Sequence, residues 1–197
     1  MLEALTGTGL AASAGLNAYI PLVLLGALSR WTGLVDLPAG WQWLGNGWVL
    51  TILVVLLAIE VVADKVPVVD HVNDVVQTFV RPTAGGLAFG AGSTSETVTV
   101  SDPGAFFSSN QWVPIVAGVL IALSVHGVKA AARPVVNTTT AGVGAPVAST
   151  AEDIGSVLVS VAAIVFPLLV IVGLLVLVWF AVWIARRRSR RRARSSV

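Results

Sequence analysis

The chain has 197 residues, of which 56% are hydrophobic and only 11% charged, and its mean hydropathy is +0.88. Because about a quarter of the residues in a soluble domain are charged, a soluble fold of this length cannot bury so much apolar surface, and the bilayer must act as solvent. There is no cysteine, which excludes disulfides, thiolate metal sites, thiol nucleophiles and iron–sulfur clusters.

The formal net charge of +2 conceals a strongly basic end. Seven of the twelve basic residues are arginines within 186–194, so the rest of the chain sets five basic residues against ten acidic ones. The arginines follow Trp179, Phe180 and Trp183, a pattern typical of a membrane exit followed by a cytoplasmic anchor. We therefore expect a basic cytoplasmic tail, 186–197, that contacts anionic lipid and binds no nucleic acid, after one transmembrane domain, 1–185.

The first apolar segment runs from about Leu5 to Ser29. It is rich in glycine, alanine and serine, which let membrane helices approach closely, and it carries Asn17 and Pro21 in mid-span. It lacks a basic n-region, so we expect it to stay in the mature protein. Residues 30–47 hold three of the seven tryptophans and predict an interfacial loop.

Further along, apolar residues predict spans at about 48–65 and 112–133, and a last helix over 152–185 that kinks at Pro167 or projects from the membrane. Two glycine-rich stretches, 70–91 and 134–150, either cross the membrane or re-enter it. Residues 93–111 predict a polar loop, with an alternation that suits a short hairpin.

A shift of 64 residues aligns LLAIEVVADK (56–65) with LIALSVHGVK (120–129). Each unit of this possible repeat is a full helix followed by a glycine-rich segment. Because the two full helices are consecutive spans, the repeat would be inverted, which is a recurring plan of transporters and channels.

Three charged stripes stand out in this apolar chain, because ionisable residues in a bilayer are costly and normally pair inside the bundle. Glu60 and Asp64 share a helix face, being four residues apart. Two further stripes repeat at steps of three and four: Asp70, Asp74, Gln77 and Arg81, then His126, Lys129 and Arg133. The candidate ion- or substrate-binding residues are Asn17, Glu60, Asp64, Lys65, Asp70, Asp74, Arg81, His126, Lys129 and Arg133.

Each of these signals has a plainer interpretation. The ion pairs can simply lock helices together, and a lone histidine such as His126 is as often a packing residue as a proton carrier. Asp70, His71, Asn73 and Asp74 include metal-ligand types, but neighbouring helix positions diverge, so we expect no bound metal. NTTTAGVGAP (137–146) is more often a loop than a carbonyl-lined filter. With no enzyme motif found, we expect no enzyme and no cofactor.

The motifs SAGLNAYIPLVLLG (13–26), EVVADKVPVVD (60–70), FVRP (79–82), HGVKAAAR (126–133) and the run 140–153 ending in STAED resemble a family of bacterial integral membrane proteins catalogued only as a domain of unknown function. The resemblance covers most of the chain except the loop 93–111 and the arginine tail. It implies a bacterial inner-membrane location and no particular activity.

We therefore predict an all-α polytopic membrane protein with four full transmembrane helices plus the two glycine-rich segments, both termini cytoplasmic, assembled as a homo-oligomer. The predicted function is transport of a small ion or polar solute, as a channel or secondary transporter. Two alternatives are a lipid-active protein, which flips lipids or binds their headgroups, and a structural or adaptor protein that transports nothing.

Overall fold

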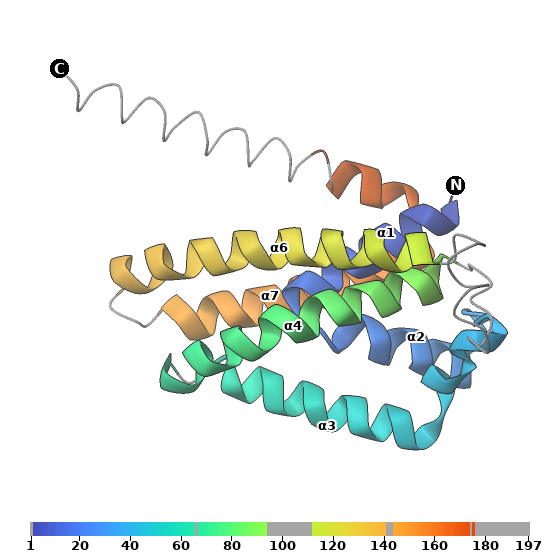
Figure 1. Cartoon of the computed structure of the whole chain (residues 1–197), viewed down its shortest axis with the longest axis horizontal. Coiled ribbons are helices and arrows are strands. Elements are labelled where there is room, and N and C mark those ends of the chain that lie inside the picture. Colours follow the sequence, from blue (N-terminus) through green and yellow to red (C-terminus); the bar gives the residue numbers. More distant parts are fainter. Residues whose placement is uncertain (1, 66, 94–111, 141–143, 174, 176–197) are drawn as a thin grey trace.

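The computed structural model describes residues 2–65, 67–93, 112–140, 144–173 and 175. Within these ranges the chain is helical and contains no strand, as the composition predicts. The elements are α1 (Leu2–Leu16), α2 (Ile20–Trp31), the 3-10 helix η1 (Ala39–Gly45), α3 (Gly47–Ala63), α4 (Pro67–Gly92), α6 (Trp112–Thr139) and α7 (Gly144–Val165). Figure 1 shows α3, α4, α6 and α7 running alongside one another as a bundle.

The first apolar segment is a helical hairpin and not the single span predicted over 5–29. Leu2 and Thr6, at the start of α1, line the same surface pocket as Leu25 of α2 and Leu34 beyond it. The start of α1 and the end of α2 therefore lie at one end of the bundle, and the turn between them lies inside it (Figure 1).

The turn is encoded by Asn17 and Pro21. Proline has no N–H to donate to the carbonyl of residue 17, and its ring would collide with that carbonyl in a continuous helix. The Asn17 side chain takes the place of the interrupted helical hydrogen bonds. Its Oδ1 accepts hydrogen bonds from the backbone N–H groups of Tyr19 at 3.1 Å and Ile20 at 3.3 Å. The chain can thus reverse at depth with two backbone donors satisfied, as a low-dielectric interior requires.

Small residues place α1 in the centre of the bundle. A Cβ on Gly7 would meet Phe89 of α4, one on Gly9 would meet Ala163 of α7, and one on Gly15 would meet Val125 of α6. Helix α1 therefore contacts three neighbours at backbone distance, the packing typical of small residues in membrane helices.

Three buried serines join α1 to α7. Ser13 Oγ lies 2.6 Å from the hydroxyls of Ser156 and Ser160, and it also donates to the Ser156 carbonyl at 2.8 Å. Interhelical hydrogen bonds of this kind contribute about 1 kcal/mol or less each in membrane proteins.

Ser13→Ala is accordingly expected to lower the free energy of unfolding by about 1 kcal/mol. The matched control is Ser124→Ala, because the exposed Ser124 hydroxyl only donates to Leu120 of its own helix. Unfolding followed by tryptophan fluorescence in mixed micelles measures both, and equal stability of the two variants would contradict an α1–α7 clamp.

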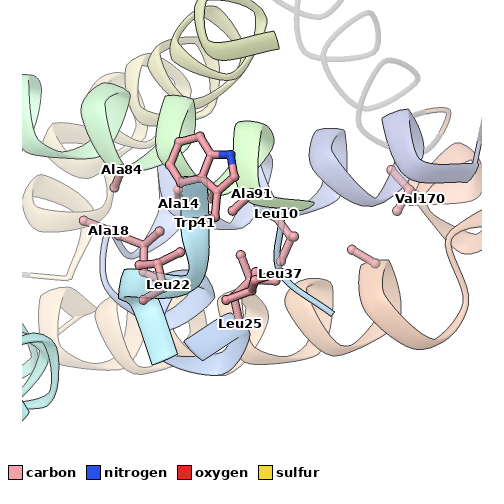
Figure 2. Packing of buried hydrophobic residues seen from close by; sticks show 13 residues of the cluster. Leu10, Ala14, Ala18, Leu22, Leu25, Leu37, Trp41, Ala84, Ala91 and Val170 are labelled. Carbon is pink, nitrogen blue, oxygen red and sulfur yellow. The ribbon is translucent and has the colours of Figure 1, made fainter. Parts of the chain in front are cut away.

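The hydrophobic core lies between the hairpin and the 3-10 helix at the tryptophan-rich end. Trp41 of η1 is buried among alanines of α1 and α4, including Ala14 and Ala91 (Figure 2). Its indole ring fits where Gly90 has no side chain. Trp31, Trp43 and Trp48 are exposed at the same end, as expected of aromatic residues at a membrane interface.

Fewer helices meet the criteria for a membrane span than the four predicted. Among the described residues two are long and apolar enough, Trp112–Arg133 within α6 and Gly144–Val165, and a third is obtained if η1 and α3, which meet at a bend of 62°, form one span. The α3 span agrees with the prediction over 48–65. The first segment does not qualify because it reverses.

The sequence left open whether the two glycine-rich stretches cross or re-enter the membrane, and the described residues of neither form a separate re-entrant segment. The inverted repeat is wrong, because α3 and α6 both run away from the tryptophan-rich end in the same direction (Figure 1). Residues 70–91 belong to the continuous 26-residue helix α4, with Pro82 in its interior. Residues 134–139 complete α6, and residues 144–150 begin α7. Helix α7 therefore starts eight residues before the predicted start at 152 and ends at Val165, just before Pro167. The predicted polar loop and the arginine tail lie outside the described residues.

Candidate functional site

A network of buried charged side chains surrounds the turn of the α1–α2 hairpin. It draws residues from the last turn of α3, the middle of α4, the second half of α6 and the first half of α7, which pass side by side at this level (Figure 1). These segments are far apart in sequence, so the site exists only in the folded bundle.

Asp64, which caps the C-terminus of α3, is the hub of the network. Its Oδ2 lies 3.3 Å from Lys129 Nζ, 3.4 Å from Arg133 and 3.5 Å from Arg81. Its Oδ1 accepts a hydrogen bond of 2.6 Å from the amide of Asn73. One carboxylate thus compensates three cations while both of its oxygens are engaged.

Glu60 lies one helical turn before Asp64 and is almost completely buried. Its Oε1 accepts from Arg81 at 2.9 Å. Its Oε2 is also buried and has no partner among the described residues. Glu60 therefore has one committed and one uncommitted oxygen, in contrast to Asp64.

His126 connects α6 to α4 through two residues of α4. The second terminal nitrogen of Arg81 lies 3.3 Å from His126 Nδ1, and His126 Nε2 lies 3.3 Å from Thr78 Oγ1. Because a guanidinium only donates, Nδ1 must accept, which assigns the ring proton to Nε2. His126 is thus held between Arg81 and Thr78.

Two acidic residues of α7 complete the network. Glu152 pairs with Lys129 at 2.7 Å and with Arg133 at 3.1 Å. Asp153 pairs with Lys65 at 3.4 Å and accepts from the Asn17 amide at 3.0 Å. Asn17 therefore orders the hairpin turn with its oxygen and anchors it to α7 with its nitrogen.

The hairpin turn itself offers backbone groups to the network. Arg81 donates to the carbonyl of Gly15 at 3.5 Å, and Lys129 donates to the carbonyl of Leu16 at 3.3 Å. These carbonyls end α1 and have no partner within the helix. The negative end of the α1 dipole is thus aimed at two cations, which stabilises both.

The ion-paired groups balance in formal charge. Four carboxylates and four cations take part: Glu60, Asp64, Glu152 and Asp153, with Lys65, Arg81, Lys129 and Arg133. Removing one of the almost fully buried charges, such as Asp64, is expected to cost about 3–5 kcal/mol, and removing one from the partly exposed Lys65–Asp153 pair should cost much less. The complete set need not add stability over an apolar core. Charge balance therefore explains how the network is tolerated, not why it is present.

The structure brings together most of the residues that the sequence singled out. Six of them are joined by direct hydrogen bonds or ion pairs: Glu60, Asp64, Arg81, His126, Lys129 and Arg133. Asn17 bonds instead to Asp153, which pairs with Lys65. Lys65 is more exposed: it pairs with Asp153 at the edge of the network and donates to the carbonyl of Val61 at 3.0 Å. Asp74 makes no ion pair among the described residues, and the side chain of Asp70 lies outside them.

Sequence reasoning missed the contributions of Glu152 and Asp153. It placed them at the start of the last helix, where acidic residues suit the helix dipole, although they lie well inside α7. The sequence did contain a usable signal. The small residues from Gly144 onward permit a helix, and a helix that begins at Gly144 places both carboxylates in its interior and not at its first turn.

Three further buried polar groups lie in this part of the bundle without a partner in the described structure. These atoms are Gln77 Oε1, Ser149 Oγ and Asp74 Oδ1. Among the described residues, no three histidine, aspartate or glutamate side chains group as metal ligands do. The network is thus built from ion pairs and amides, with uncommitted acceptors spread through it.

The fold and the site define an all-helical protein with apolar helices able to cross a membrane and a charge network inside the bundle. The chain belongs to the family described as a domain of unknown function, DUF4126, which matches residues 4–187. This match confirms the family expected from the sequence motifs. No curated protein and no solved structure matches the chain.

Proposed function

We propose that this protein moves a small ion or polar solute across the membrane, as a channel or secondary transporter. The observation that supports this best is the position of the hairpin turn. An interrupted helix ends at the buried charge network, and Arg81 and Lys129 bind its last carbonyls. Transporters commonly build substrate sites from interrupted helices near the middle of the bilayer.

The depth of the network agrees with this role. At 1.5 Å per residue, Glu60 lies about 18 Å along α3 from Trp48, and His126 lies about 21 Å along α6 from Trp112. A hydrocarbon core is about 30 Å thick, so both residues fall inside it, roughly 3–6 Å beyond its middle, when the exposed tryptophan end marks one interface. Ionisable residues at that depth are costly and commonly mark solute pathways or proton relays.

A purely structural bundle would have simpler means of holding its helices together. Glycine contacts and the Ser13 cluster already join α1 to three neighbours. The eight charged groups add a desolvation cost that such contacts avoid. We therefore assign Glu60 and Asp64 to binding a cation or proton. His126, Lys129 and Arg133 balance that charge or hold an anionic group.

The remaining parts of the proposal concern the setting of the protein. We place it in the bacterial inner membrane as a non-enzymatic homo-oligomer without a cofactor. The arginine tail lies in the cytoplasm against anionic lipid, following the positive-inside rule. The N-terminus shares that side.

The experiment is solute flux in liposomes. The purified protein is reconstituted and solid-supported membrane currents are recorded under gradients of cations, anions and pH, for the parent and for Glu60→Gln. We expect current in the parent and its loss in Glu60→Gln, which keeps the size of the side chain and an acceptor for Arg81. Asp153→Asn, at the more exposed edge, is the matched control and should retain current.

Absence of current from folded protein under every gradient would contradict transport. In that case a bound anionic lipid near Lys129 and Arg133 would favour the lipid-active alternative. A change of stability alone in a Glu60 and Lys129 double variant would favour the structural or adaptor alternative.

A further inference from the structure

The two carboxylates at the end of α3 differ in how much freedom the fold leaves them. Asp64 accepts from Asn73 with one oxygen and faces Lys129, Arg81 and Arg133 with the other. Protonating Oδ2 would place a donor in front of three cations that only donate, and protonating Oδ1 would displace the N–H of Asn73. Asp64 is thus suited to remain a fixed anion.

Glu60 has the opposite arrangement. Its contact with Arg81 uses Oε1 alone, and Oε2 is buried without a partner among the described residues. A proton added to Oε2 leaves the Arg81 bond to Oε1 in place. Asp64 Oδ2, which lies 3.5 Å from Arg81 in this structure, is a second carboxylate contact of the guanidinium. When Glu60 becomes neutral, Arg81 therefore retains one anionic neighbour, while the network gains one net positive charge.

We propose that Glu60 is a reversible proton-binding site, with the proton carried on Oε2, and that Asp64 is the fixed countercharge of the surrounding cations. Its role in driving transport rests on the proposed function, but the binding of the proton does not. The step is a plain acid–base reaction: an O–H bond forms at Oε2, its proton comes from water, and no other bond changes.

The surroundings of Glu60 favour a proton over a metal ion. Arg81 occupies Oε1, leaving one carboxylate oxygen, and the described residues contain no cluster of metal-ligand side chains. A metal ion needs several such oxygens, whereas a proton needs one.

The other charged or titratable groups that face this site come from every neighbouring element. They are Tyr19 from the hairpin turn, Asp64 from α3, Arg81 from α4, Lys129 from α6 and, one ion pair further away, Glu152 and Asp153 from α7. His126 lies behind Arg81. Asp74 of α4, on the far side of His126, also has a buried carboxylate oxygen without a partner among the described residues. Glu60 differs from Asp74 in that its other oxygen is held by Arg81.

The test is infrared difference spectroscopy of the full-length protein in lipid as the pH is changed. A protonated carboxyl has a C=O stretch that a carboxylate lacks. We expect one such band, typical of a buried group, to appear reversibly on acidification in the parent and in Asp153→Asn, and to be lost completely in Glu60→Gln. An unchanged band in folded Glu60→Gln would overturn the proposal, as would the absence of any titrating buried band in the parent.

Glu60→Asp provides a second variant if the glutamine variant fails to fold. This variant keeps a carboxyl group, but the shorter side chain moves that group away from Arg81. The band should therefore persist, and the pH at which half of it has appeared should shift. An unshifted midpoint would overturn the assignment to residue 60.

The proton site and the transport function are separable in the same preparations. The Glu60 band without current under any gradient would support the proton site while contradicting transport. A current that does not change with the pH gradient, measured on protein that lacks the band, would support transport and overturn the proton site.

Discussion

Asp64→Asn is expected to lower the free energy of unfolding by about 3–5 kcal/mol. The substitution keeps the Oδ1 acceptor for Asn73 but places an NH₂ group where Oδ2 faces three cations. The NH₂ group then faces three buried side chains that also only donate, and one of their positive charges is no longer compensated by a carboxylate. Unfolding in mixed micelles, followed by tryptophan fluorescence, measures the loss.

Two controls isolate the cause. Asp153→Asn removes a charge of the same type from a pair that solvent partly reaches, so a loss below about 1 kcal/mol is expected. The double variant Asp64→Asn with Lys129→Gln restores formal balance and should recover part of the stability. If Asp64→Asn costs no more than Asp153→Asn, Asp64 is not the hub of the network.

Gly118→Ala is expected to cost about 3 kcal/mol, at the upper end for overpacking. Gly118 lies where α4 and α6 cross, and an added Cβ would press against the backbone carbonyl of Gly85 and the Cβ of Phe89. Backbone cannot move aside as a flexible side chain can, so the two helices must separate. Because α4 carries Arg81 and α6 carries Lys129, their separation should also reduce flux.

Gly127→Ala is the matched control on the same helix. An added Cβ there meets nothing within 4 Å, so stability should be unchanged or rise by up to about 1 kcal/mol from helix propensity. Thermal unfolding of the two variants in the same lipid or detergent compares them directly. Similar stability for both would show that the α4–α6 crossing tolerates separation.

Much of the candidate site was readable from helical spacing. Glu60 and Asp64 share a face because they are four residues apart, and the same rule groups His126, Lys129 and Arg133. In an apolar chain each such stripe must find a partner inside the bundle. Asp64 of α3 does so with two residues of the α6 stripe, Lys129 and Arg133.

The pairing partners were less readable, because spacing along one helix says nothing about which other helix packs against it. Glu60 pairs with Arg81 of α4, not with the α6 cations. Glu152 takes Lys129 and Arg133 from the other side. A buried cation has several candidate anions in the sequence, and only the packing of the helices selects among them.

The hairpin illustrates the same division. Asn17 and Pro21 mark an interruption in the first segment, but a kinked span and a full reversal use the same residues. The contacts of the turn with other helices decide that the chain reverses. Asp153 accepts a hydrogen bond from Asn17, and Arg81 and Lys129 donate to the last carbonyls of α1.

The sequence by itself determined the helical class, the apolar helix over 48–65, the tryptophan-rich end and the charged stripes, because apolar periodicity and the cost of charge in lipid act locally along each helix. Tertiary structure alone decided that the first segment reverses inside the bundle and that 70–91 belongs to one continuous helix. It also decided that Asp64 is the hub, while one oxygen of Glu60 has no partner among the described residues. These features depend on side chains from helices distant in sequence meeting at one depth, which no local pattern encodes.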